Sequence, residues 1–154
     1  MQTTIETARF GRVAFTAEET IAFPWGLPGF AGLHRFLALS LTEQPGFVWL
    51  QSVDEPSIAL PAADPWTIFA DYEPRMPAYA TQTLEIAGPE DFTILCIVVV
   101  TKGAAQMTMN LMAPVIINLR TRTARQVMLD NSNYSVRAPI PRKDAQTQGA
   151  PQPA

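Results

Sequence analysis

Proline is the feature that most limits what this chain of 154 residues can fold into. The chain contains 14 prolines and eight glycines. A proline has no amide hydrogen for the interior of a helix, and its ring clashes with the preceding turn. Few stretches between the prolines can therefore hold a long helix. The pattern argues against a helical bundle and favours short strands that are joined by turns.

The strongest strand prediction is the apolar run FTILCIVVVT at residues 92–101. It is rich in β-branched residues and contains neither proline nor glycine, so we expect both of its faces to be covered. This places it at the centre of a sheet or barrel. Shorter runs of strand-forming residues, bounded by turn signals, predict strands at residues 11–15, 20–23, 36–41, 47–53, 57–60, 107–111, 115–119 and 125–129.

Helical content should be small. Asp64 can cap a short turn that begins at Pro65, because the fixed φ of proline suits the first helical position. A second short turn is predicted near Pro89. Many short strands with few helices predict a mostly β fold, a small antiparallel β-barrel-like single domain with one or two short helices. We expect this domain to span residues 1–137.

The remaining segment, residues 138–154, reads APIPRKDAQTQGAPQPA. It has no aromatic residue and only one aliphatic residue larger than proline. Such a segment buries too little apolar surface to offset the entropy lost on ordering. The sequence therefore predicts a flexible tail that contains proline and glutamine.

Charge and composition limit the classes of partner. Eleven Lys and Arg residues stand against 14 Asp and Glu residues, a net charge of −3. This balance disfavours direct nucleic-acid binding and suits a basic protein partner.

The single cysteine, Cys96, excludes an internal disulfide. The longest apolar run, residues 94–100, is too short to cross a membrane and no signal peptide is visible, so we expect a cytoplasmic protein without membrane contact.

Few residues could support catalysis or metal binding. His34 is the single histidine, so a hydrolase would have to pair it with an unspecified carboxylate. One cysteine and one histidine cannot supply a zinc site, and no glycine-rich phosphate loop is present. Asp71 and Glu73 could serve as an acid–base pair, although a solvated acidic edge is favoured. We expect a non-enzyme without cofactor or metal; a barrel that binds a small ligand such as flavin is the alternative.

The segment IAFPWGLPGF at residues 21–30 is predicted to contain a tight turn. Gly26 and Gly29 can adopt the positive φ that such a turn needs, and Pro28 restricts the chain between them. Trp25 precedes the first of these glycines and could either enlarge a contact surface or pack inward. By residue type, we expect the core to include Phe23, Phe30, Trp49 and Leu50.

Three segments, taken in order, resemble the FliW family of flagellar assembly factors. The first resembles the family's opening, the second its middle and the third its C-terminal strands. The first segment is residues 21–30. The second is WLQSV at 49–53, together with Asp64, Pro65 and residues 71–73. The third is NLMAPVIIN at 110–118, together with RQVML at 125–129 and Tyr134. The resemblance covers residues 5–141. The chain departs from the family at Trp25, where a polar residue is usual.

The resemblance implies a β-barrel-like protein without catalytic activity that binds two partners in mutually exclusive fashion. One is the dimeric translational regulator CsrA, and the other is flagellin. Without flagellin, such a factor holds CsrA and blocks its action on flagellin messenger RNA, non-competitively with RNA. When unsecreted flagellin accumulates, it takes the factor and releases CsrA. The output is a coupling between flagellin level and flagellin translation.

Five residues are candidates for contact with a partner. We expect Asp71, Tyr72 and Glu73 to be extended and to form part of the surface that faces CsrA, where the carboxylates would repel RNA phosphates. The alternative is that Tyr72 packs inward and only the acids are solvated. Contact from the segment between Asn110 and Pro114 is also possible. Otherwise the side-chain amides of Asn110 and of Asn118, at the end of the same motif, satisfy loop backbone groups.

Overall fold

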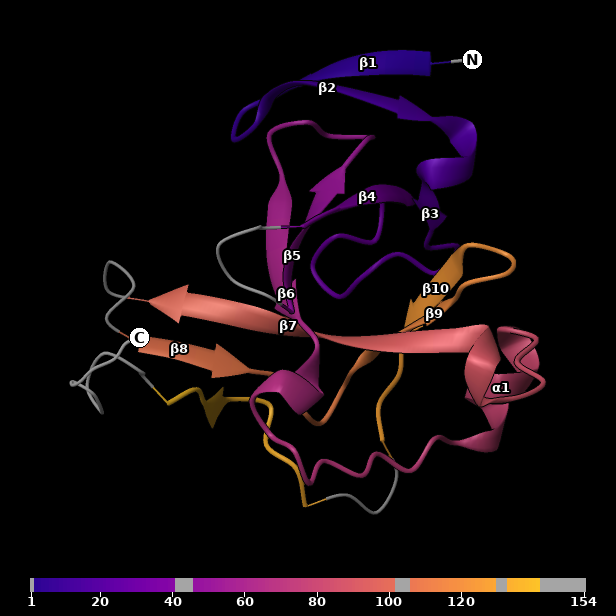
Figure 1. Ribbon diagram of the computed structural model, residues 1–154, viewed down its shortest axis with the longest axis vertical. Coiled ribbons are helices and arrows are strands. Elements are labelled where there is room, and N and C mark those ends of the chain that lie inside the picture. The colour runs from indigo at the N-terminus through magenta and orange to yellow at the C-terminus, as the bar shows by residue number, and fades with distance from the viewer. Residues whose placement is uncertain (1, 41–45, 102–105, 130–132, 142–154) are drawn as a thin grey trace.

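The computed structural model describes residues 2–40, 46–101, 106–129 and 133–141. Its main feature is a closed antiparallel barrel, which confirms the predicted fold class (Figure 1). Around the barrel the strand order is β7-β6-β5-β4-β3-β10-β9, and β9 pairs with β7 to close it. β3 and β10 are parallel. The strands are β3 (Ile21–Ala22), β4 (Arg35–Ser40), β5 (Phe47–Ser52), β6 (Ala59–Ala63), β7 (Phe92–Thr101), β9 (Val115–Asn118) and β10 (Thr123–Gln126).

β7 is the predicted central strand, and it pairs along both edges. Its first half pairs with β9, and its second half pairs with β8 (Gln106–Met109). β8 in turn pairs with β11 (Ala138–Pro139). The expectation that both faces are covered holds only in part for the barrel half, where Ile94, Leu95 and Cys96 are buried but Thr93 is exposed. It is wrong for Val99 and Val100, which are exposed because this end of the strand extends beyond the barrel wall.

Several elements were not predicted, of which a strand and a helix of six residues each are the longest. β1 (Gln2–Thr7) pairs with β2 (Gly11–Thr16) in a separate hairpin that lies above the barrel in Figure 1. The helix α1 (Ala78–Thr83) lies beside the first half of β7. Neither segment carries a strong apolar pattern, so neither was visible in the sequence. The remaining elements are short 3-10 turns, η1 (Ala17–Glu19), η2 (Pro65–Thr67) and η3 (Pro89–Asp91).

The predicted turn at Pro65 is present as η2. The carboxylate of Asp64 accepts a hydrogen bond from the backbone N–H of Trp66 at 2.9 Å, as the capping interpretation requires. η3 begins at Pro89, where the second turn was predicted. Both positions were identifiable from a proline at the start of the turn, and η2 has the side-chain cap of Asp64 as a second signal.

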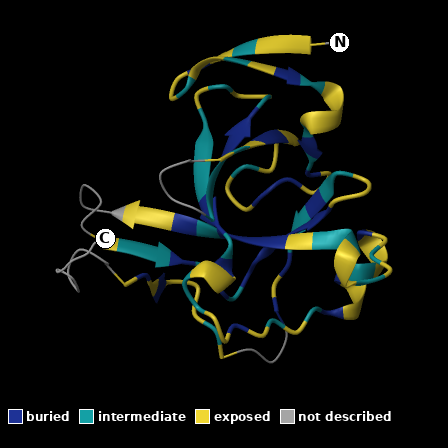
Figure 2. Ribbon diagram, in the orientation of Figure 1, coloured by how far each residue is buried: buried dark blue, intermediate teal, exposed yellow. Residues whose placement is uncertain are grey.

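Buried side chains form three clusters (Figure 2). The largest fills the barrel, and of the residues expected there Phe23 and Leu50 are fully buried while Phe30 and Trp49 are half-buried. A second cluster lies under β7 and β8 and includes Tyr72, Cys96 and Met109. A third joins α1 to the barrel wall through Ala80, Leu84, Ile94, Ile116 and Val127.

The ordered chain continues past the expected boundary at residue 137. Ala138 pairs with Met109, and Ile140 is buried and donates its N–H to the carbonyl of Met107 at 2.9 Å. The single large aliphatic residue of the predicted tail thus lies in the second cluster. Residues 142–154, the rest of that predicted tail, lie outside the described residues.

The predicted glycine turn is confirmed. Gly26 and Gly29 have φ values of 67° and 83°, and an isolated backbone bridge joins Leu27 to Phe30 across Pro28 and Gly29. A Cβ atom at Gly26 would lie 2.6 Å from the carbonyl oxygen of Ala31, whereas one at Gly29 would meet nothing within 4 Å. Position 26 therefore needs glycine for space as well as for conformation, and position 29 for conformation alone.

Replacing each of these glycines with alanine should separate the two requirements. We expect Gly29→Ala to lower the free energy of unfolding by about 1 kcal/mol, through left-handed strain. Gly26→Ala should lower it by about 2–4 kcal/mol, because the backbone clash is added. Urea unfolding of both variants measures the difference. Equal losses would show that the contact with Ala31 costs nothing.

Candidate partner-binding surfaces

The acidic segment, residues Asp71–Glu73, leaves the barrel after η2. Asp71 and Glu73 are exposed, whereas Tyr72 between them is only 3% exposed. The segment is not extended as expected, because Asp71 lies in a turn in which the N–H of Tyr72 donates to the carbonyl of Phe69 at 3.0 Å. Both acidic residues nevertheless lie at the surface, while the tyrosine between them does not. The structure thus follows the alternative reading in which Tyr72 packs inward. Of the three candidate residues, Asp71 and Glu73 can face a partner and Tyr72 cannot.

Tyr72 fixes this segment to the rest of the protein. Its hydroxyl donates to the carbonyl of Leu111 at 2.7 Å, and its ring packs edge-on against Tyr134 at 4.7 Å. The indole N–H of Trp66 donates to the carbonyl of Tyr72, and the N–H of Glu73 donates to the hydroxyl of Tyr134, both at 2.8 Å. The carboxylates are therefore presented on a backbone that is held at several points.

Burial also keeps the Tyr72 side chain neutral. Desolvation is the main cause that raises its pKa above the ordinary value, with nearby Cys96 adding to the effect. Desolvation likewise raises the pKa of the Cys96 thiol to about 12, although its interaction with the Tyr72 side chain acts in the opposite direction. A thiol reacts as the thiolate, so Cys96 is a packing residue and not a nucleophile.

The candidates Asn110 and Pro114 lie in the turn where the chain passes from β8 to β9 along one edge of β7. The side-chain oxygen of Asn110 accepts a hydrogen bond from the N–H of Ala113 at 3.0 Å. The backbone N–H of Asn110 donates to the carbonyl of Ile97. Its amide thus stabilises the turn, which confirms the structural interpretation. Pro114 is buried, so the expected contact through this proline is wrong.

Asn118 has the same kind of role at the end of β9. It is fully buried, and its amide nitrogen donates to the carbonyl of Leu84 at 2.6 Å. Its oxygen accepts from the N–H groups of Arg120 and Thr121 at 2.8 and 3.0 Å. One side chain thereby joins the C-terminal end of α1 to the turn before β10. This bears out the expectation that it satisfies loop backbone groups.

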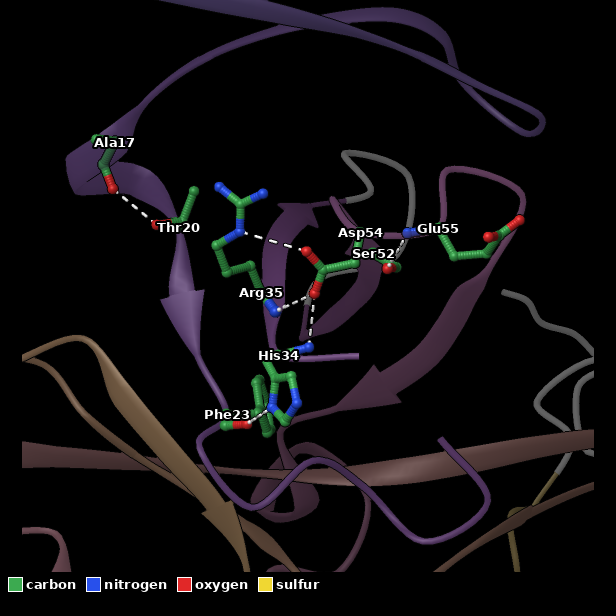
Figure 3. Close-up of polar contacts among 8 residues, drawn as sticks. All are labelled: Ala17, Thr20, Phe23, His34, Arg35, Ser52, Asp54 and Glu55. Carbon is green, nitrogen blue, oxygen red and sulfur yellow. Dashed lines mark hydrogen bonds and ion pairs between the residues drawn. The ribbon is translucent and has the colours of Figure 1, made fainter. Parts of the chain in front are cut away.

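The region around the single histidine does not resemble a hydrolytic site (Figure 3). The Asp54 carboxylate accepts hydrogen bonds from the backbone N–H groups of His34 and Arg35, at 2.6 and 3.0 Å. It is not the hydrogen-bond partner of the imidazole ring. The His34 ring instead places Nδ1 3.0 Å from the carbonyl of Phe23. Desolvation raises the pKa of Asp54, but these backbone hydrogen bonds and the Arg35 guanidinium outweigh it, so the net pKa is lowered. Asp54 is a structural cap and not a partner of the histidine ring.

An open groove lies where β6 and β7 separate. Their ladder contains the pairs Ala62–Ile97 and Ala63–Cys96. The next pair would set Pro61 opposite Val98, and proline has no amide hydrogen to donate, so the ladder ends there. In Figure 1 the second half of β7 runs away from β5 and β6 beyond this point.

This groove has a volume of about 970 Å³ and is mostly apolar. Its floor includes Phe30, Leu60 and Ile97, which pack against the barrel core. Exposed apolar side chains around it are Tyr79, Val99, Val100, Met128 and Val136. None of these was singled out from the sequence. The alternation in residues 125–129 carried the only signal, because Met128 must face away from buried Val127 and Leu129.

The charged side chains that line the described part of the groove are Arg9 and Arg137, without any Asp or Glu. The Arg9 guanidinium stacks on Trp49 at 4.2 Å. Nearby, Arg125 lies between Trp25 and Tyr79, at 4.3 and 4.9 Å from their ring centres. Trp25 is therefore partly exposed and stacked on a cation. The groove thus combines an apolar floor with a positive rim.

The groove does not have the features expected of a flavin site. Such a site needs polar groups that converge on a ligand. Of the two amide side chains that line the groove, each has one end engaged within the protein: the oxygen of Asn110 accepts from the N–H of Ala113, and the nitrogen of Gln126 donates to the carbonyl of Ala113 at 2.9 Å. Among the described residues, no group of three or more His, Cys, Asp or Glu side chains could hold a metal ion. No described helix is long and apolar enough to span a membrane.

Comparison with known proteins gives one consistent result. The family model FliW protein matches residues 4–140. The flagellar assembly factor FliW of Pseudothermotoga lettingae is 37% identical over 134 residues, which is 86% of this chain and 85% of that protein. The FliW of Bacillus licheniformis is 37% identical over 136 residues, covering 88% and 95%. A crystal structure of a flagellar assembly factor FliW superposes with a TM-score of 0.84 at 30% identity, covering 91% of this chain and 98% of that one.

The Tyr72 hydroxyl provides a direct test of how the acidic segment is held. Tyr72→Phe should lower the free energy of unfolding by about 1–3 kcal/mol, because the buried carbonyl of Leu111 loses its donor. Tyr79→Phe is the matched control, since Tyr79 is 39% exposed, and it should change stability by less than about 0.5 kcal/mol. Equal effects in urea unfolding would contradict the anchoring role.

Alkaline pH should destabilise the fold through the same pair of residues. Both Tyr72 and Cys96 have raised pKa values in the folded protein, so the folded state holds their protons after the unfolded chain has released them. Their contribution to stability is complete below the unfolded thiol pKa of about 8.5 and is lost as pH rises toward about 12. Thermal unfolding across this range should show the fall. Cys96→Ala should delay its onset toward the ordinary tyrosine pKa of about 10; an unchanged onset would exclude Cys96.

Proposed function

The chain belongs to the FliW family of flagellar assembly factors, and from this premise we propose that it binds CsrA and flagellin in alternation. Bound to CsrA, it relieves the repression of flagellin translation without occupying the RNA site. Bound to accumulated flagellin, it releases CsrA. The protein acts by covering partner surfaces and performs no bond chemistry.

The observation that supports CsrA binding is the rigid display of Asp71 and Glu73. Both acidic residues are exposed, and the buried Tyr72 between them anchors the backbone that carries them. Within the described residues the ion pairs are Arg12–Glu6 and Arg35–Asp54, so neither acid is neutralised by one. An RNA-binding regulator must carry basic surface, which such carboxylates complement.

The same charges explain how binding could oppose RNA without overlap. Carboxylates held beside a basic surface raise the local negative potential and repel phosphates that approach it. Such repulsion between separate sites is a coupling free energy, and salt screens it over about 10 Å at 0.1 M. Arg75, exposed two residues after Glu73, limits the acidic patch on that side. The effect therefore depends on Asp71 and Glu73 together.

Charge reversal tests this role. Asp71→Lys combined with Glu73→Lys should weaken CsrA binding about tenfold or more at low salt, and the loss should shrink at high salt. Glu18→Lys with Glu90→Lys makes the same change of net charge at other exposed acids and serves as the control. Isothermal titration with purified CsrA measures all three proteins.

Two results would count against the proposal. If the reversed variant binds CsrA as well as the wild type at low salt, Asp71 and Glu73 are not in the CsrA surface. If the wild type captures no CsrA in a pull-down, or if added flagellin fails to displace captured CsrA, the alternation itself is refuted.

A further inference from the structure

We infer that the groove between β6 and β7 is the flagellin site, and that it takes an extended apolar segment flanked by carboxylates which pairs with the open edge of β7. The identity of the partner rests on the proposed function. The chemistry of the segment rests on the groove alone, through its backbone edge, its apolar floor and the sign of its charged rim.

The backbone edge follows from the register. Asn110 donates its N–H to the carbonyl of Ile97, so that carbonyl points toward β8. Successive residues of a strand direct their N–H and C=O groups to opposite sides. Val98 and Val100 therefore direct theirs toward β6, where the described ladder has already ended at Ala62–Ile97. A strand edge that is open in this way is a template for an added strand.

Side chains beside this edge suit apolar residues of a guest. Val99 is 48% exposed at the groove, and Leu60 and Ile97 form part of its floor. An added strand that presents alternate apolar side chains to this floor would bury them against the barrel core. Main-chain hydrogen bonds would then supply affinity, and the floor would supply selectivity.

The positive charge at the rim of the groove distinguishes the two proposed partners. Arg9 and Arg137 line the groove in the described structure, and no carboxylate accompanies them there. The stack on Trp49 holds the Arg9 guanidinium at the rim. A basic RNA-binding surface would be repelled by these charges, whereas a segment that carries Asp or Glu would be attracted. The groove therefore suits flagellin, and the acidic segment suits CsrA.

The two surfaces share their supports, which accounts for alternation. Asn110 and Ala113 line the groove, while the carbonyl of Leu111 between them accepts the hydroxyl of Tyr72. A strand seated in the groove would thus press on the turn that positions the acidic segment. Coupling of this kind changes the affinity at each site by the same factor.

A charge placed in the groove tests the assignment. Val99→Glu should weaken flagellin binding about tenfold or more, through loss of apolar contact and repulsion of the guest's acids. Leu119→Glu is the matched control, because Leu119 is 46% exposed but does not line the groove, and it should bind normally. Both variants should bind CsrA within about twofold of the wild type. Titrations with purified flagellin and purified CsrA give these affinities.

A variant at the charged rim of the groove keeps the assignment testable if Val99→Glu fails to fold. Arg137→Glu changes an exposed residue and should weaken flagellin binding about fivefold at low salt, whereas Arg12→Glu in the β1–β2 hairpin should not. Amide hydrogen exchange of Val100 reports the pairing directly, and flagellin should slow it while Leu119→Glu leaves this protection intact.

The outcomes separate the two proposals. If the wild type binds no flagellin, both the proposed function and this inference fall. If flagellin binds the wild type, Val99→Glu and Arg137→Glu alike, only the groove assignment falls. Loss of CsrA binding in place of flagellin binding would overturn the choice of partner. Unchanged exchange at Val100 on flagellin binding would overturn strand pairing.

Discussion

The fold depends on the way in which one ten-residue strand, β7, divides its hydrogen bonds. Its first half pairs with β9 and closes the barrel, its middle pairs with β6, and its second half carries β8 and β11. The change of partner from β9 to β8 requires the turn at Asn110, which is stabilised by that residue's own side chain. The end of the pairing with β6 leaves the groove. Core, turn and surface thus all follow from the pairing of one strand.

Features with local causes were visible in the sequence. The β7 run, the cap at Asp64 and the turn that contains Gly26 each depend on chemistry within a few residues, and each was found where expected. β1 and α1 were missed because their residues show no apolar period of their own. β1 becomes a strand through pairing with β2, and α1 becomes ordered where Ala80 and Leu84 pack on the barrel.

The candidate site was only partly predictable for the same reason. The order Asp71, Tyr72, Glu73 left open whether the tyrosine lies on the surface with the acids or packs inward. The tyrosine packs inward because its hydroxyl donates to the carbonyl of Leu111, 39 residues further along the chain. Pro114 was a candidate for partner contact and is buried. Apart from the alternation around Met128, the sequence carried no signal for the groove, because the groove arises where two strands stop pairing.

An open strand edge also carries a hazard, since it can join to the edge of another copy and begin aggregation. Two features of this molecule oppose that process. The unpaired stretch is short, and Pro61 offers no amide on the facing strand. A second molecule would bring Arg9 and Arg137 of its own against the same cations. A second copy of the chain would therefore be repelled at this edge, which opposes edge-to-edge pairing between copies.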